Sequence, residues 1–197
     1  MNKKLWAKAA LAAVAAAGVM MAAGCGGSDD KKAAASGDKQ GPVMQKIKES
    51  GKIVVGTASG YPPYEFIDAS KADKTVIGID MEIAQALADK LGVKLEVQDM
   101  NFQSLLSSLT SGKVDIAISG INPTDERRKT MDFSDNYLPT EQMVLIRKAD
   151  ADKYKSLEDL YGKTIGVQKS TTQETLTKNE IKDAQIVGLA HVPEAVL

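Results

Sequence analysis

The feature that most constrains the fold is an alternation of strand-like and helical segments along residues 53–118. Short β-rich or alternating apolar runs occur at Ile53–Thr57, Val93–Val97 and Val114–Ile118, which is typical of strands. Between them, apolar residues recur at helical spacing from Ile79 to Leu91 and from Phe102 to Ser111. The order strand, helix, strand, helix, strand with short links predicts a doubly wound α/β unit with a parallel sheet.

A second α/β unit is predicted after a connecting segment. Residues 142–146 have the composition of a strand that leaves the first unit, and residues 147–155 are polar. The pattern then restarts with a short helix at 156–160, a strand at 164–168, a helix from about Thr171 and a strand at 184–187. We therefore expect one lobe over 42–145 and another over 146–197, with a cleft between them. Ligands of doubly wound sheets bind at the carboxyl ends of the strands, which here lead into the loops 58–66, 100–102 and 119–127.

The start of the chain has the pattern of a secretory signal peptide. Lys3, Lys4 and Lys8 form a basic segment, and an uncharged apolar stretch runs from Ala9 to Ala23. At about 15 residues this stretch is shorter than the roughly 20 that a membrane-spanning helix needs, and it fits the apolar region of a signal peptide. A short alanine-rich helix of a soluble protein is the alternative, which the flanking residues disfavour.

The apolar stretch ends in Ala22-Ala23-Gly24-Cys25, which resembles the lipobox of bacterial lipoproteins, where the cysteine accepts a diacylglyceryl group. Cys25 is the single cysteine, so an internal disulfide is excluded. We expect residues 1–25 to be a lipoprotein signal peptide with its lipobox, and Cys25 to anchor the chain to a membrane that it does not span. Residues 26–41 are polar and lack apolar periodicity, which predicts a flexible tether.

Charge and composition exclude several classes of function. A net charge of −1 argues against nucleic acid as the main partner. The sequence contains no phosphate-binding loop, catalytic triad pattern or cluster of metal-ligating residues, and its single histidine, His191, has no ligand partners at suitable spacing. We therefore expect neither a metal nor a cofactor.

Several motifs occur together in the order and spacing of one known family. Gly78-Ile79-Asp80-Met81-Glu82-Ile83, followed by Leu87-Ala88 and Leu91, resembles the signature of the extracellular solute-binding proteins for polar amino acids. The other motifs that carry the resemblance are Tyr61-Pro62-Pro63-Tyr64, Phe102, Asp115-Ile116-Ala117-Ile118-Ser119-Gly120, Thr124-Asp125-Glu126-Arg127, Met131-Asp132-Phe133-Ser134, Gly166-Val167-Gln168 and Ser170-Thr171-Thr172-Gln173. The resemblance covers about residues 43–197. It implies a two-lobed clamp, like that of periplasmic binding proteins, with doubly wound sheets. Chains of this family usually continue well past the equivalent of Leu197, so the resemblance also implies that the second lobe is incomplete here.

The resemblance further implies a function and a set of ligand-binding residues. It points to the extracytoplasmic, lipid-anchored substrate-binding component of an ABC importer, a monomer that delivers a free amino acid to the membrane permease. Arg127 matches the family position that pairs with the ligand carboxylate, a role that suits a planar, two-pronged donor. The residues at the family's ligand-binding positions are Tyr61, Phe102, Ser119, Gly120, Asn122, Arg127, Thr172 and Gln173. The alternatives are a solvated charge for Arg127, turn and cap chemistry for the small polar residues, and core packing for the two aromatic residues.

One departure from the family pattern bears on the ligand. Binders of cationic amino acids in the family often carry a carboxylate where this chain has Ala58, so we expect a neutral polar amino acid such as glutamine to compete with arginine. The carboxylate that holds the ligand ammonium is expected beyond Leu197. Two other classes of function stay open at this point: an enzyme on the same fold, similar to cyclohexadienyl dehydratase, and the sensor domain of a membrane receptor.

Overall fold

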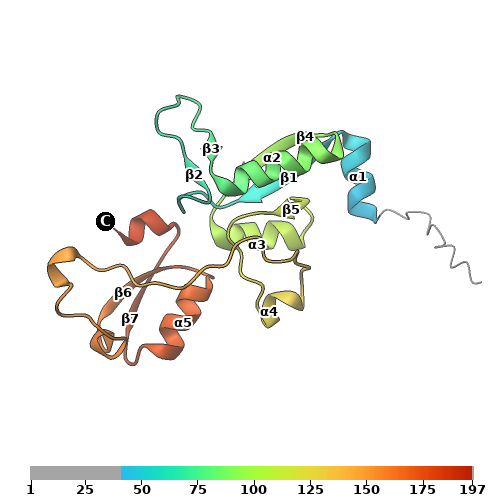
Figure 1. The fold of residues 1–197 in the computed structure, drawn as a ribbon. Helices are drawn as coiled ribbons and strands as arrows, with labels where there is room; N and C mark the ends of the chain where they lie inside the picture. Colours follow the sequence, from blue (N-terminus) through green and yellow to red (C-terminus); the bar gives the residue numbers. More distant parts are fainter. Residues whose placement is uncertain (1–40, 197) are drawn as a thin grey trace, which may run out of the picture. The chain divides into compact units, whose positions relative to one another are not determined.

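The computed structural model describes residues 41–196. The expected signal peptide, the lipobox with Cys25 and all of the expected tether except Gly41 lie outside these residues. The helices are α1 (Pro42–Ser50), α2 (Ile79–Leu91), α3 (Phe102–Thr110), α4 (Asp125–Arg128) and α5 (Thr172–Glu180) (Figure 1). The strands are β1 (Lys52–Thr57), β2 (Phe66–Ile67), β3 (Val76–Ile77), β4 (Lys94–Asp99), β5 (Ile116–Ala117), β6 (Thr164–Gln168) and β7 (Gln185–Leu189). Short 3-10 turns are formed by Lys148–Asp150, Glu158–Leu160 and Val192–Ala195.

A three-stranded parallel sheet in the order β4-β1-β5 organises the first half of the described chain. The register with β4 runs from Lys52 opposite Lys94 to Thr57 opposite Asp99. Val55 pairs with Ile116 of β5, a strand that is shorter than the predicted 114–118. Apart from Lys52, β1 is buried along its whole length, as a strand covered on both faces should be. The predicted parallel α/β arrangement is confirmed.

Helices cover both faces of this sheet. Ile53 and Val55 project to one face and pack with Ile47 of α1 and with Ala84 and Ala88 of α2. On the other face α3 approaches so closely that a Cβ added at Gly56 would lie 2.5 Å from Leu105 Cδ1. Because β1 and β5 are paired in parallel, the loops at their carboxyl ends lie at the same edge of the sheet.

Helix α2 occupies the predicted range, from Ile79 to Leu91. It ends at Gly92, whose left-handed backbone (φ 68°) directs its N–H to the carbonyls of the last turn. At its start no side chain caps the helix. Instead, the N–H groups of Ile79 and Asp80 donate to the carbonyls of Pro63 and Tyr64, at 3.1 and 3.0 Å. The proline-containing loop is therefore the cap of α2.

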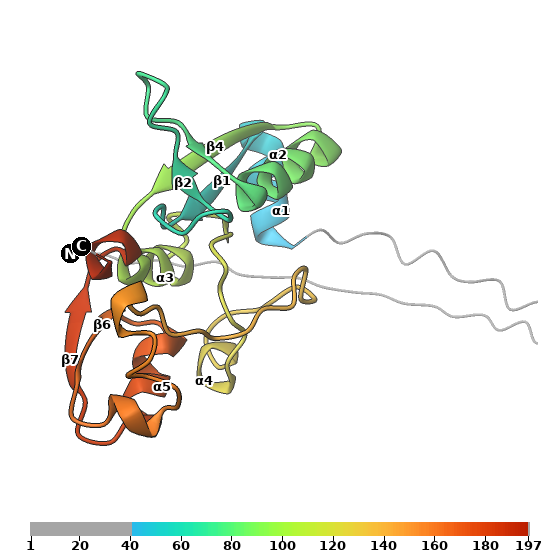
Figure 2. The ribbon, with the colours of Figure 1, turned by 60° about the vertical axis from the view of Figure 1, so that its left-hand side comes forward.

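Four elements in the first half were not predicted: α1, β2, β3 and the short helix α4. Helix α1 packs against the sheet through Ile47. Strands β2 and β3 form an antiparallel hairpin whose loop extends away from the sheet in both views (Figures 1 and 2). Each of these strands has only two residues, too few for a periodic pattern to be visible in the sequence.

The second half contains a two-stranded parallel sheet of β6 and β7, connected by α5. These elements confirm the predicted strands and helix after residue 163. The predicted strand at 142–146 is wrong, because no strand is assigned there. Residues 132–146 form no backbone–backbone hydrogen bond within the described chain, and a β-type sequence becomes a strand only where a neighbouring strand pairs with it. Within residues 41–196, no helix combines the length and the apolar character needed to cross a bilayer.

Candidate functional site

A cavity of about 1030 Å³ is lined by residues from both sheet-containing halves. All eight residues predicted to bind the ligand lie on its wall: Tyr61, Phe102, Ser119, Gly120, Asn122, Arg127, Thr172 and Gln173. Ala58, the position of the departure from the family pattern, also lines it. The structure thus brings together residues that are more than 110 positions apart in the chain. Their role in ligand binding stays a prediction.

Arg127 lies at the end of the short helix α4, which Thr124 caps by accepting a hydrogen bond from the Arg127 N–H at 3.2 Å. Its guanidinium Nη1 donates to the Asn122 carbonyl at 2.9 Å, and Nη2 donates to the Ser170 carbonyl at 3.0 Å. Burial lowers the pKa of Arg127, although an arginine stays protonated at neutral pH. No carboxylate in the described chain forms an ion pair with it. The cavity therefore contains a half-buried positive charge whose hydrogen-bond partners are neutral.

Aromatic rings border the same charge. The Arg127 guanidinium lies 5.3 Å from the centroid of the buried Phe102 ring, within the range of a cation–π contact. Tyr61 stacks on Tyr64 with ring centroids 5.3 Å apart, so its position on the cavity wall is fixed by a neighbour. Phe102 is the first residue of α3, which Asn101 caps by accepting from the Ser104 N–H at 2.9 Å. Phe102 thus lies beside the cation, and Tyr61 lines the same cavity.

The N-terminus of α5 forms the opposite boundary of the cavity. Thr171 caps this helix by accepting from the Glu174 N–H at 3.2 Å. Thr172 and Gln173 follow in the first turn and contribute backbone N–H groups that have no intrahelical partner. The Asn122 side-chain amide donates to Thr172 Oγ1 at 2.9 Å, so residues of the two halves are in direct contact at the cavity.

Ser119 and Gly120 follow β5 and are held in place by hydrogen bonds with other segments of the first half. The Ser119 hydroxyl accepts from the Ala58 N–H at 3.1 Å, and the Gly120 N–H donates to the Asp80 carboxylate at 2.9 Å. Gly120 has a left-handed backbone (φ 53°), which favours glycine at this position. The turn that presents this segment to the cavity is thus fixed by both its conformation and its hydrogen bonds.

Glu65 is a cavity residue that the sequence analysis did not single out. It is 1% exposed, and its Oε1 accepts from the Ser119 hydroxyl at 2.7 Å. Burial and the nearby charge of Asp80 raise its pKa to about 8, against the lowering effect of the Ser119 hydrogen bond. No sequence signal distinguishes it, because an acidic residue in a loop is usually exposed.

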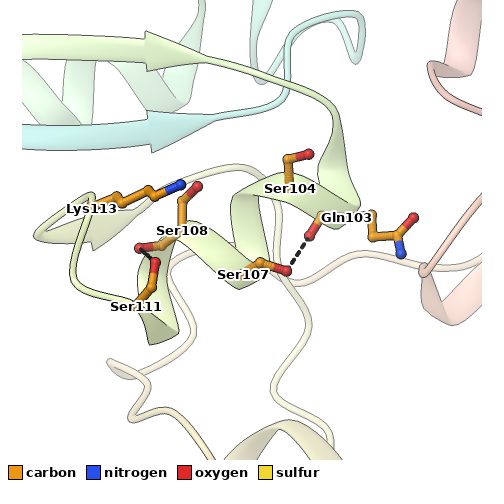
Figure 3. A pocket seen from close by; sticks show the side chains of 6 residues that line it. All are labelled: Gln103, Ser104, Ser107, Ser108, Ser111 and Lys113. Carbon is orange, nitrogen blue, oxygen red and sulfur yellow. Dashed lines mark hydrogen bonds between the residues drawn. The ribbon is translucent and has the colours of Figure 1, made fainter.

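A smaller hollow of about 460 Å³ lies along α3 and contains none of the predicted residues (Figure 3). It is lined by Gln103, Ser104, Ser107, Ser108, Ser111 and Lys113. The Ser107 and Ser111 hydroxyls donate back to carbonyls of their own helix, at 3.2 and 3.3 Å (Figure 3). Among residues 41–196 there is also no group of three or more His, Cys, Asp or Glu placed to hold a metal ion.

The parallel α/β sheets and the cavity define a two-lobed binding-protein fold, which solved structures share. An amino acid ABC transporter substrate-binding protein from Streptococcus pneumoniae, bound to L-arginine, matches with a TM-score of 0.74 and 41% identity over 78% of this chain and 64% of that one. The ancestral amino acid-binding protein AncCDT-1, described as a precursor of cyclohexadienyl dehydratase, matches with a TM-score of 0.73 and 37% identity over 78% of this chain and 67% of that one.

Residues 53–185 match the bacterial extracellular solute-binding proteins, family 3. The matched segment is more than half of the chain, and the chain belongs to this family. The arginine-binding extracellular protein ArtP of Bacillus subtilis is 44% identical over 128 residues, which are 64% of this chain and 48% of ArtP. The chain thus spans about half the length of this relative.

Proposed function

We propose that the whole protein binds a free polar amino acid in the cavity and delivers it, as the extracytoplasmic substrate-binding component of an ABC importer, to the membrane permease. The observation that carries this proposal is Arg127. A half-buried guanidinium with only neutral partners, beside Phe102 and near the first turn of α5, is suited to a small carboxylate. Membership of an extracellular solute-binding family supports the same function.

Each end of an amino acid has a complementary group on the cavity wall. Its carboxylate would accept hydrogen bonds from Arg127 and from the first turn of α5 at Thr172 and Gln173. Its ammonium would donate to the Asn122 side-chain oxygen and to the backbone at Ser119–Gly120. Its side chain would lie between Tyr61 and Phe102. L-Arginine is the first ligand to test, because ArtP is named as an arginine-binding protein.

The proposal includes the location of the protein. The family description is extracellular, which supports work outside the cytoplasm. A signal peptide that ends at Cys25, a lipid on this cysteine and a tether over 26–41 would keep the binding unit close to the permease.

An enzymatic function is the second candidate, since AncCDT-1 is described as a precursor of a dehydratase. Glu65 is protonated at neutral pH and lines the cavity, which are two properties of a general acid. However, its side chain is 1% exposed and its Oε2 is closed off from solvent, so it has no direct path to a ligand atom. This geometry favours binding over proton transfer.

Isothermal titration calorimetry of the whole protein with L-arginine, L-lysine, L-histidine and L-glutamine tests the proposal. We expect saturable 1:1 binding of at least one of them, with unchanged ligand recovered afterwards by NMR. Absence of binding to all four would reject the proposal, and steady conversion of a ligand would favour the enzyme instead.

A further inference from the structure

Two acidic side chains lie buried together beneath the loop that follows β5. Glu65 is 1% exposed and Asp80 is 0% exposed. Neither forms an ion pair with a lysine, arginine or histidine of residues 41–196. Placing two charged carboxylates in the interior without a cation beside them is unfavourable, because each charge loses its hydration. Such a pair is stable when the two groups share one proton.

The hydrogen bonds around the pair indicate which group holds the proton. Asp80 accepts from the Gly120 N–H and from the Tyr137 hydroxyl, both at 2.9 Å, so both of its oxygens are engaged as acceptors. Glu65 accepts one hydrogen bond, from Ser119 to Oε1. Its Oε2 is buried and lacks a partner in the described chain. A proton on Oε2 makes this atom a hydrogen-bond donor, which can then donate toward the neighbouring Asp80.

Other ionisable groups also face Glu65. Asp99 at the end of β4 adds negative charge, and its carboxylate is held by the Ser59 N–H and hydroxyl at 2.8 and 2.6 Å. Tyr61 of the same loop and Tyr137 are each influenced by the charge of Glu65, and burial is the main reason that the pKa of each is raised. Burial is the largest cause that raises the pKa of Glu65 to about 8, and the charges of Asp80 and Asp99 raise it further, against the lowering effect of the Ser119 hydrogen bond.

We propose that Glu65 and Asp80 are positioning residues that hold one proton between them and thereby fix the ligand-facing segment Ser119–Asn122. This inference rests on the proposed function, because that segment is part of the proposed amino acid site. Glu65 holds the segment through Ser119, and Asp80 holds it through Gly120. When the shared proton leaves, two buried negative charges repel each other and the segment loosens. Amino acid affinity is then lost at high pH through a step separate from the ionisation of the ligand.

The first test needs no ligand. In the full chain, the amide signals of Ala58 and Gly120 are followed by NMR from pH 5.5 to 9.5. We expect them to titrate together with a midpoint near pH 8 in the wild type. In Glu65→Gln they stay constant, because the amide accepts from Ser119 and donates to Asp80 as the protonated acid does. Constant signals in the wild type, or an unchanged titration in Glu65→Gln, would overturn the proposal.

Tyr137→Phe provides an independent variant if Glu65→Gln does not fold. The Tyr137 hydroxyl donates to Asp80 and stabilises the doubly charged pair more than the singly charged pair, and Tyr137→Phe removes this donor. The midpoint of the Ala58 and Gly120 titrations should therefore move to higher pH, and a midpoint that stays in place or falls contradicts the shared-proton arrangement.

The second test measures L-arginine binding by calorimetry at pH 6.5 and pH 9. The ligand ammonium ionises in this range for every variant, so the readout is the affinity ratio of Glu65→Gln to the wild type. We expect a ratio near one at pH 6.5 and about tenfold or more in favour of Glu65→Gln at pH 9. Glu82→Gln is the control: it changes an exposed acid on α2, the helix that contains Asp80, and its affinity should match that of the wild type at both pH values.

A ratio that stays near one at pH 9 would overturn the proposal. If L-arginine binds at neither pH and the other three amino acids also fail, the proposed function is wrong. The ligand-free titration still decides whether the acid pair positions the segment.

Discussion

At the scale of single residues, Arg127 has the most direct consequence for ligand binding. We expect Arg127→Ala to weaken amino acid binding by roughly 2–5 kcal/mol, because a desolvated carboxylate loses its charged partner. This loss corresponds to about 30-fold to several-thousand-fold in affinity. Arg127→Lys should recover only part of it, since an ammonium cannot form the two-pronged pair. Calorimetric titration of both variants checks the prediction, and an Ala variant that binds within about threefold of the wild type would exclude Arg127 from the site.

Glu65 predicts how the stability of the ligand-free protein depends on pH. Its pKa is raised from the ordinary 4.5 to about 8 in the folded chain, so between these values the folded state holds a proton that the unfolded state has released. The contribution of Glu65 to the free energy of unfolding is therefore fully present below about pH 4.5. It falls as the pH rises toward 8 and stays constant above that value.

Thermal melts followed by circular dichroism at pH 5 and pH 8.5 test this dependence. We expect the melting temperature of the wild type to fall over this interval and that of Glu65→Gln to fall less. An equal decrease in the two proteins would show that another group causes it.

At the scale of elements, the start of α2 depends on a glycine. Gly78 has φ 129°, and a Cβ added there would lie 2.2 Å from the Tyr64 carbonyl oxygen. That carbonyl and its neighbour accept the first N–H groups of α2, so the loop cannot move away without loss of the helix cap. Gly78→Ala should therefore lower the free energy of unfolding by about 3 kcal/mol or more, through backbone strain and overpacking together.

Gly92→Ala is a suitable control for this substitution. Gly92 also has a positive φ, of 68°, but nothing lies within 4 Å of an added Cβ. Only the strain of the left-handed backbone remains, worth roughly 1–2 kcal/mol. Urea denaturation compares the two variants, and equal losses would show that contact with the Tyr64 carbonyl adds nothing.

At the scale of the whole molecule, the cavity depends on contacts between segments far apart in the chain. Arg127 donates to the Ser170 carbonyl and Asn122 donates to Thr172, so the two halves are in direct contact at the cavity. These groups are the ones proposed to hold the amino acid carboxylate and ammonium. A ligand would replace at least part of these contacts, and the net affinity would be the difference between the two sets.

Attachment to a membrane is also a property of the whole molecule. Cys25→Ser removes the thiol that would accept the lipid, so we expect the variant to be released from the membrane fraction or to keep its signal peptide. Cell fractionation with labelled fatty acid measures this change. Label that persists on Cys25→Ser would show that the lipid is attached elsewhere or that the lipobox interpretation is wrong.

Elements with local signals could be predicted from the sequence. Helix α2 was predicted from Ile79 to Leu91 because its apolar residues recur at helical spacing within one segment. The parallel direction of the strands in the first sheet was predicted from the alternation of strand-like and helical segments. The family motifs predicted eight residues that line one cavity, although their distances and partners were not contained in the sequence.

Features that depend on neighbours distant in the sequence could not be predicted, because they arise only when the chain folds. The β-type segment at 142–146 is not a strand, because pairing requires a partner that local sequence does not specify. Glu65 and Asp80 are 15 positions apart, and both are buried in the folded chain, where they accept hydrogen bonds from Ser119 and Gly120. An ionisable group is governed by its burial and by the charges around it, and both of these are set by the folded arrangement of the whole chain.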